Sequence, residues 1–214
     1  MQENHIAVEK TARYFTIGEA GENTREVWYV CHGYGQLAKY FIKHFEVLDN
    51  GSRLIVAPEG LSRFYLNGFS GRIGATWMTK EDRLNEIEDY LGFLNTLHAH
   101  IFKRLYRENV KITVLGFSQG TATVCRWLTE GNIYADRLIL WAGLMPPEID
   151  FQTDGKVFQG LQNYVVLGKN DPFANQEMLD QQKAILKKHQ IPYKFLTFDG
   201  EHEIHDDTLR KIAK

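Results

Sequence analysis

One serine in the chain has the neighbours that a catalytic nucleophile requires. Ser118 is the centre of the pentapeptide Gly-Phe-Ser-Gln-Gly, residues 116–120. An apolar stretch, Lys111–Leu115, precedes this motif, and a helical segment, Gln119–Glu130, follows it. A strand that turns into a helix within a few residues puts the central serine in a strained, exposed backbone conformation, and glycine is needed two residues to either side. The pattern therefore predicts a serine that attacks an acyl carbonyl.

A serine hydroxyl needs a base, and the base needs an acid that orients it. Asp171 directly follows an apolar segment, Tyr164–Leu167, and His202 comes just after the last such segment, Tyr193–Phe198. The chain order serine, acid, histidine suits a serine that follows a strand of a parallel sheet. We predict Asp171 as the acid and His202 as the base. Three alternatives stay open. His205 is a second candidate for the base. Asp171 could instead form a turn or cap a helix, and His202 could instead be an exposed loop residue.

The negative oxygen of the tetrahedral intermediate needs two preorganised N–H donors. One is expected from the residue after the nucleophile, Gln119. The other is expected from residues 32–36, His-Gly-Tyr-Gly-Gln, which follow an apolar segment ending at Cys31. We predict the backbone N–H groups of Tyr34 and Gln119 as the oxyanion hole. We expect His32 to fix this loop and not to act as a second base.

The elements that must position these residues alternate between two kinds. Short runs rich in β-branched and aromatic residues predict strands at 12–17, 26–31, 53–57, 111–115, 137–141, 164–167 and 193–198. Segments with helical periodicity predict helices at 37–48, 80–108, 119–130, 175–189 and 206–213. Several strands are almost wholly apolar, which is typical of parallel strands covered on both faces. The sequence therefore predicts an α/β fold with a mostly parallel sheet of about seven strands and helices on both faces.

One connection, residues 60–79, is long, rich in aromatic residues and interrupted by glycines. Such a loop in a compact domain is usually functional. We predict that it serves as a lid or pocket cover of a single domain spanning residues 1–214, although its rings could instead cap the core. The candidate substrate-binding residues are four from this connection and three that follow strand ends: Phe64, Tyr65, Phe69, Trp77, Leu144, Met145 and Phe173.

Composition excludes several other classes of protein. The chain has 214 residues, of which 43% are hydrophobic, as in an ordinary globular domain. A net charge of −2 leaves no basic field for a phosphate backbone, so we expect no nucleic-acid partner. There is no apolar run of the length of a membrane span and no apolar stretch typical of a secretory signal. Two cysteines, Cys31 and Cys125, make no disulfide framework, and we expect a cytoplasmic protein.

No metal or cofactor is predicted. The helical His-Glu-x-x-His spacing is absent around His202 and His205, and there is no phosphate-cradling or dinucleotide-binding glycine motif. The sequence leaves a monomer and a homodimer open.

Four motifs together resemble a known family. The His-Gly-x-Gly loop at 32–35, Gly-Phe-Ser-Gln-Gly at 116–120, Gly-x-x-Asp at 168–171 and Gly-x-His-Glu-Ile at 200–204 are similar to those of the phospholipase/carboxylesterase family of α/β-hydrolases. That family includes small carboxylesterases and acyl-protein thioesterases. The resemblance extends from about Glu26 to the end of the chain. It implies the α/β-hydrolase fold, with Ser118, Asp171 and His202 as the catalytic triad.

The sequence therefore predicts a serine hydrolase that cleaves carboxylic esters or thioesters of small or medium acyl or aryl groups through an acyl-enzyme intermediate. The expected partner is a small ester molecule. Two alternatives stay open. The first is a non-catalytic ligand-binding module on a hydrolase scaffold, because a fold does not fix a function. The second is a peptidase or acyltransferase that uses the same three residues.

Overall fold

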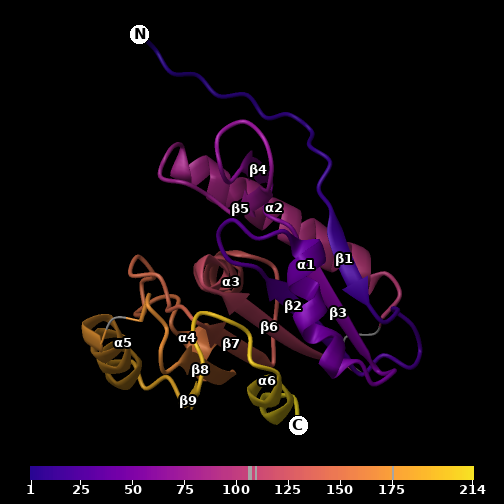
Figure 1. Ribbon diagram of the computed structural model, residues 1–214, viewed down its shortest axis with the longest axis vertical. Helices are drawn as coiled ribbons and strands as arrows, with labels where there is room; N and C mark the ends of the chain where they lie inside the picture. Colours follow the sequence, from indigo (N-terminus) through magenta and orange to yellow (C-terminus); the bar gives the residue numbers. More distant parts are fainter. Residues whose placement is uncertain (106–107, 109, 175) are drawn as a thin grey trace.

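Seven strands form the central sheet of the computed structural model, which describes residues 1–105, 108, 110–174 and 176–214 (Figure 1). Their spatial order is β1-β3-β2-β6-β7-β8-β9. The bounds are β1 Tyr14–Ile17, β2 Glu26–Cys31, β3 Arg53–Pro58, β6 Lys111–Phe117, β7 Arg137–Trp141, β8 Gln162–Gly168 and β9 Tyr193–Phe198. Only the β1–β3 pair of this sheet is antiparallel. The predicted α/β fold with a mostly parallel sheet is confirmed.

Helices cover both faces of the sheet because side chains alternate along each strand. The helical elements are α1 Ala38–Phe41, the 3₁₀ helix η1 Ile42–Leu48, α2 Arg83–Phe102, α3 Gln119–Glu130, α4 Lys156–Gln159, α5 Gln176–Lys188 and α6 Asp206–Ile212. In β2, Val27 and Tyr29 are buried in the core on the side of α2, α3 and α5. Trp28 and Val30 are buried in the other core, with α1, η1 and α6.

Two predicted helices differ from those observed. The segment 37–48 is one short turn of α-helix followed by the 3₁₀ helix η1, whose β-branched and aromatic residues favour a regular α-helix less strongly. The predicted helix 80–108 is observed as α2, which begins after Asp82 because that residue has a left-handed backbone (φ 46°). Residues 106, 107, 109 and 175 of the predicted helices lie outside the described residues.

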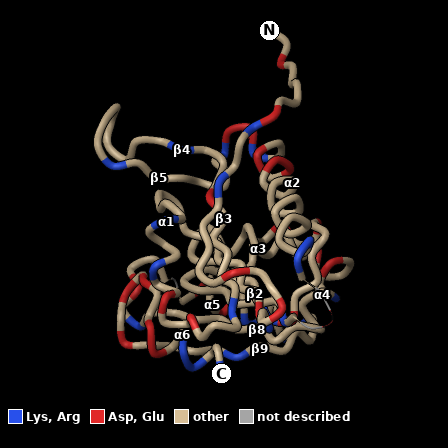
Figure 2. The backbone as a smooth tube through the Cα atoms, turned by 90° about the vertical axis from the view of Figure 1, so that its right-hand side faces the viewer, with Lys and Arg blue, Asp and Glu red and all other residues tan. Residues whose placement is uncertain are grey.

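The connection 60–79, expected as a loop, contains a β-hairpin. Its strands are β4 Ser62–Tyr65 and β5 Ile73–Thr76, paired antiparallel. The turn between them includes Gly68 and Gly71, both with a positive φ that favours glycine. Figure 2 shows this hairpin projecting from the body of the molecule.

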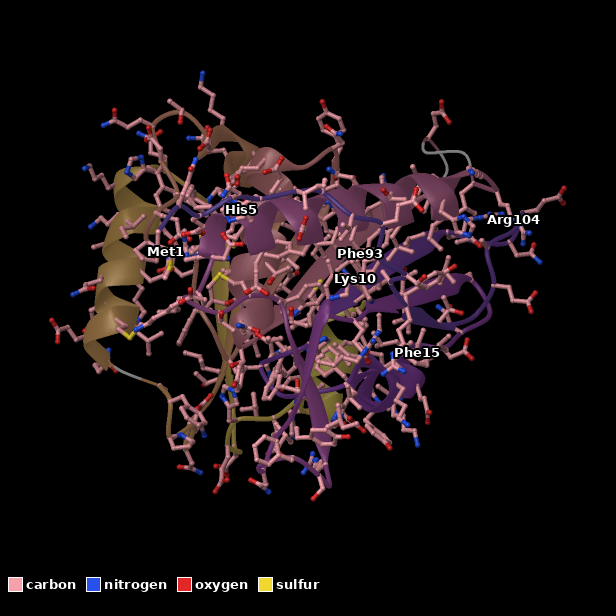
Figure 3. The ribbon with its side chains drawn as sticks, turned by 90° about the horizontal axis from the view of Figure 1, so that it is seen from above. Met1, His5, Lys10, Phe15, Phe93 and Arg104 are labelled. Atoms are coloured by element: carbon pink, nitrogen blue, oxygen red, sulfur yellow. The ribbon has the colours of Figure 1, made fainter. Side chains whose placement is uncertain are left out.

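The segment before β1 has no regular secondary structure and extends to the N-terminus seen at the top of Figure 1. Part of it lies against α2, since Lys10 and Phe93 line the same surface hollow and are neighbours in Figure 3. Among the described residues, no helix has both the length and the apolar character that crossing a membrane requires.

Candidate active site

Ser118 has the strained backbone that the motif predicts. Its φ is 53° and its ψ is −116°, between the end of β6 and the first residue of α3. Both flanking glycines are required by close backbone contacts. A Cβ on Gly116 would lie 2.3 Å from the carbonyl oxygen of Gly120, and a Cβ on Gly120 would lie 2.3 Å from the carbonyl oxygen of Cys31. Strain of this kind is held by the surrounding structure and is concentrated at functional sites.

Asp171 and His202 meet where β8 and β9 end. The two strands pair through Gly168 and Phe198, and their carboxyl ends therefore lie side by side. Nδ1 of His202 lies 2.8 Å from Oδ2 of Asp171, whose side chain is only 1% exposed. The N–H of Phe173 donates to the other carboxylate oxygen at 2.8 Å. These contacts fix the carboxylate so that it can orient the imidazole ring.

His205, the competing base, is engaged elsewhere. Its Nδ1 lies 3.0 Å from the hydroxyl of Thr208, and its ring stacks on Phe198 at a centroid distance of 5.0 Å. It also directly precedes α6. The geometry therefore gives the Asp171 carboxylate to His202 and not to His205.

The imidazole of His202 lies beside the end of β6, the strand that precedes Ser118. Its ring centroid is 4.9 Å from that of Phe117, the residue before the serine, and 4.7 Å from that of Phe173. Among the described residues, neither the Ser118 hydroxyl nor Nε2 of His202 has a hydrogen-bond partner. The structure therefore has no hydrogen bond between the Ser118 hydroxyl and the His202 ring, and catalytic hydrogen bonds often tighten only when substrate is bound.

The loop 32–36 lies directly against the serine. A Cβ on Gly33 would be 3.1 Å from Cβ of Ser118. The N–H of Gly33 donates to Oε1 of Gln36 at 2.8 Å, which folds the loop into a tight turn. Within the described part of the chain, the N–H groups of Tyr34 and Gln119 have no acceptor. Neither N–H group is thus occupied by an acceptor of the described chain, which is one requirement of an oxyanion hole.

His32 is a buried structural residue, as expected. Its Nδ1 lies 2.8 Å from the carbonyl oxygen of Gly33, and its Nε2 accepts from the N–H of Gly60 at 3.0 Å. Burial lowers the pKa of the His32 imidazole, which favours the neutral ring that these two contacts need. The indole of Trp77 stacks on this ring and donates to the His32 carbonyl oxygen at 2.8 Å.

The β4–β5 hairpin is joined to the same loop. The N–H of Gly35 donates to the carbonyl of Ala75 at 2.9 Å, and the N–H of Ala75 donates to the carbonyl of Gln36 at 3.1 Å. The side chain of Gln119 completes the connection, because its Nε2 donates to the carbonyl of Met78 at 2.9 Å. The serine turn, the 32–36 loop and the hairpin therefore form one hydrogen-bonded unit.

The sequence analysis did not identify Glu59, whose side chain is hydrogen-bonded to the hairpin and to α1. Its buried carboxylate accepts from Nε of Arg13 at 2.6 Å, from Nε of Arg63 at 2.7 Å and from the N–H of Ala38 at 3.1 Å. Burial alone would raise the pKa of Glu59, but the hydrogen bonds from the two arginines outweigh it, so the pKa is lowered. Glu59 therefore ties β1, α1 and the hairpin together as a carboxylate.

Three of the seven candidate substrate-binding residues line a cavity that Asp171 also borders, whereas Ser118 and His202 do not line it. Leu144, Met145 and Phe173, together with Asp171, border a cavity of about 310 Å³ between α3, the segment after β7 and the start of α5. Its walls are mostly apolar. A cavity of this size and lining suits a small ligand.

The four candidates from the hairpin region do not line this cavity. Trp77 is 1% exposed and packs in the core against His32, so its expected role as a cover is wrong. Phe69 is 98% exposed in the hairpin turn. The ring of Phe64 packs on that of Tyr34 at 5.1 Å, and Tyr65 is half exposed. Aromatic composition did not reveal which rings face inward.

Solved structures provide the comparison for this arrangement, while no model of a protein family matches the chain. A phospholipase/carboxylesterase from Dyadobacter fermentans DSM 18053 is similar, with a TM-score of 0.69, 18% sequence identity and 97% of each chain covered. Acyl-protein thioesterase 2 from Zea mays has a TM-score of 0.70 and 16% identity, with 95% of this chain and 96% of that chain covered. The chain has the α/β-hydrolase fold. A carboxylesterase from Bacillus cereus has a TM-score of 0.65 and 15% sequence identity, with 94% of this chain and 92% of that chain covered.

The α/β-hydrolase fold accounts for the gathering of residues that are distant in sequence. Ser118 follows β6, Asp171 follows β8 and His202 follows β9, all at the carboxyl ends of parallel strands. In open α/β sheets, ligands bind at this edge. The predicted resemblance to the phospholipase/carboxylesterase family is thus matched by the fold of solved members.

Proposed function

We propose that the protein is a serine esterase that hydrolyses carboxylic esters or thioesters of small or medium acyl groups. The observation that carries this proposal is the Asp171–His202 pair, 2.8 Å apart, with the His202 ring against Phe117, the residue before a serine in a strained strand-to-helix turn. The similarity in fold to solved carboxylesterases and a thioesterase supports it.

In the proposed reaction, His202 takes the proton of the Ser118 hydroxyl through Nε2 as the oxygen attacks the acyl carbonyl. Asp171 holds the ring with Nδ1–H directed at its carboxylate and stabilises the imidazolium that forms. The N–H groups of Tyr34 and Gln119 receive the developing oxyanion. The imidazolium then protonates the leaving alcohol or thiol, and an ester to Ser118 remains. Water, deprotonated by His202, hydrolyses that ester and restores the hydroxyl.

The acyl group is proposed to occupy the cavity bordered by Leu144, Met145 and Phe173. Its volume of about 310 Å³ is at the lower end for ligand pockets, which favours short and medium chains. No cofactor has a role in this mechanism.

Hydrolysis of p-nitrophenyl acetate and p-nitrophenyl butyrate tests the proposal. The wild type should release p-nitrophenol with saturation kinetics, and Ser118→Ala should lose at least about 10⁴-fold in kcat. Ser70→Ala is the matched control, since Ser70 is a glycine-flanked serine in the exposed hairpin turn. Equal turnover by the wild type and Ser118→Ala would contradict the proposed nucleophile. An inactive wild type would favour the binding-module alternative.

A further inference from the structure

The loop after β2 uses most of its hydrogen-bond donors within the fold. The N–H of Gly33 donates to Oε1 of Gln36 at 2.8 Å, and the N–H of Gln36 donates to the carbonyl of Gly33 at 3.2 Å. The N–H of Gly35 donates to the carbonyl of Ala75 at 2.9 Å. Among the described residues, the N–H of Tyr34 and the amide nitrogen Nε2 of Gln36 have no acceptor. The proposed reaction uses the first of these two donors and leaves the second without a role.

The side-chain amide of Gln36 is held in one orientation. The backbone of this residue is fixed on both sides, since its N–H donates to Gly33 and its carbonyl accepts from the N–H of Ala75 at 3.1 Å. The amide atom that faces the N–H of Gly33 must be an acceptor, and it is therefore the oxygen. The nitrogen is the other atom of the same amide. It is bound to no acceptor in the part of the chain that the structure describes.

The amide of Gln36 and the nucleophile border the same small space. A Cβ on Gly33 would lie 3.1 Å from Cβ of Ser118 and 3.2 Å from Oε1 of Gln36. The ring of Phe117 closes a third side, with its Cδ1 3.0 Å from the same point. Gly33 and Tyr34 are consecutive, so an amide anchored on the N–H of the first lies beside the N–H of the second. The free nitrogen of Gln36 is therefore in the same region as the proposed oxyanion donor and the serine.

We infer that Gln36 is a further catalytic residue, whose Nε2–H donates to the oxyanion together with the N–H groups of Tyr34 and Gln119. The inference rests on the proposed function and adds a donor to it. As the Ser118 oxygen forms its bond to the acyl carbon, the electron pair of the C=O bond moves to the carbonyl oxygen. The charge on that oxygen is then shared among the three N–H groups. An amide that is already oriented needs no reorganisation when this charge develops.

Two substitutions of Gln36 separate a donor to the oxyanion from an anchor of the loop. Gln36→Glu keeps an oxygen for the N–H of Gly33 but replaces Nε2 by a second acceptor. Gln36→Met lacks both groups and carries no charge. A donor role predicts that Gln36→Glu is the slower variant, because its carboxylate repels the oxyanion. A role as anchor alone predicts the reverse order, with Gln36→Glu close to the wild type and Gln36→Met impaired.

Hydrolysis of p-nitrophenyl butyrate is the first measurement. We expect kcat of Gln36→Glu to fall at least about 10²-fold, as for the loss of one oxyanion donor, with little change in KM. Gln152→Glu is the matched control, since Gln152 is exposed in the segment before α4, and its kcat should equal that of the wild type. Equal kcat values for Gln36→Glu and Gln152→Glu would overturn the inference and leave the esterase activity intact. If Gln36→Met fails to fold, Gln36→Glu still decides, because it keeps the contact to Gly33.

Binding of n-butylboronic acid separates this inference from the proposed function. Its boron accepts an electron pair from the Ser118 oxygen, and a hydroxyl of the tetrahedral adduct takes the place of the oxyanion. In calorimetric titration, Kd should be at least about tenfold higher for Gln36→Glu than for the wild type, the size expected for a charge-assisted hydrogen bond. A wild type that hydrolyses no ester contradicts the proposed function, and this titration then still tests the donor. Equal Kd values, or no binding to the wild type, would overturn the inference.

Discussion

The carboxylate of Asp171 is buried and holds Nδ1 of His202 at 2.8 Å, although 31 residues separate the two in sequence. The second oxygen of the same carboxylate accepts from the backbone N–H of Phe173. One acid therefore orients the ring and is itself oriented by the backbone. Such a pair places Nε2 of the ring away from the carboxylate, where a proton can be taken from a nucleophile.

Asp171→Asn should reduce kcat for p-nitrophenyl butyrate by about 10⁴-fold, because an amide favours the wrong tautomer of the ring. The substitution is nearly isosteric, so the fold should be retained. Asp199→Asn is the matched control, since Asp199 is exposed and lies in the same region of the chain. An activity of Asp171→Asn close to that of Asp199→Asn would show that another group orients the base.

Gly74→Ala should disturb the proposed oxyanion hole without a direct contact to substrate. A Cβ at this position would lie 2.4 Å from the carbonyl oxygen of Gly35, so the hairpin and the 32–36 loop must move apart. We expect a fall in kcat of about 10²–10³-fold, as for loss of one oxyanion donor. Gly92→Ala in α2 has open space around its Cβ and should leave kcat unchanged. Equal kcat values for the two variants would contradict the proposed role of this contact.

The buried His32 should make stability depend on pH. Its pKa is lowered in the folded state by burial, whereas the unfolded chain binds a proton near the ordinary value of about 6.5. Stability from this residue is therefore fully present above about pH 6.5 and is lost as the pH falls towards the lowered pKa. The loss should reach at most about 1.4 kcal/mol per pH unit.

His32→Gln should remove this dependence, because glutamine does not titrate. Urea unfolding at pH 7.5, 6.5 and 5.5 gives the free energy of unfolding for the wild type and the variant. The variant should be less stable at pH 7.5, and its deficit should shrink as the pH falls. His44→Gln is a control for loss of an exposed imidazole. A constant deficit at all three pH values would contradict a neutral, buried His32.

The triad candidates could be predicted from sequence because each follows a strand within a few residues. Ser118 carries a local signature, and Asp171 and His202 are placed by the ends of apolar strands that parallel pairing brings together. The structural role of His32 in the 32–36 loop was also predictable, since the residue adjoins the glycines of that loop. These positions depend on local order along the chain, which the sequence shows directly.

Positions that depend on packing could not be predicted in this way. Glu59 binds Arg13, 46 residues away, and no local pattern marks that contact. Trp77 lies in the core because its indole stacks on His32, while Phe69, eight residues earlier, is exposed. Both are aromatic residues of the 60–79 connection, so their residue type does not distinguish a buried ring from an exposed one. The ion pair of Arg126 with Glu148 joins a helix to a connection after another strand, which only the folded chain brings together.

The central claim is that Ser118 is an activated nucleophile, and labelling with a fluorophosphonate tests it most directly. Intact-mass analysis should show one adduct per chain, and peptide mapping should place it on Ser118. Ser118→Ala should not react, and His202→Ala should react much more slowly than the wild type. A folded wild-type protein that remains unlabelled, or an adduct on another residue, would contradict the account.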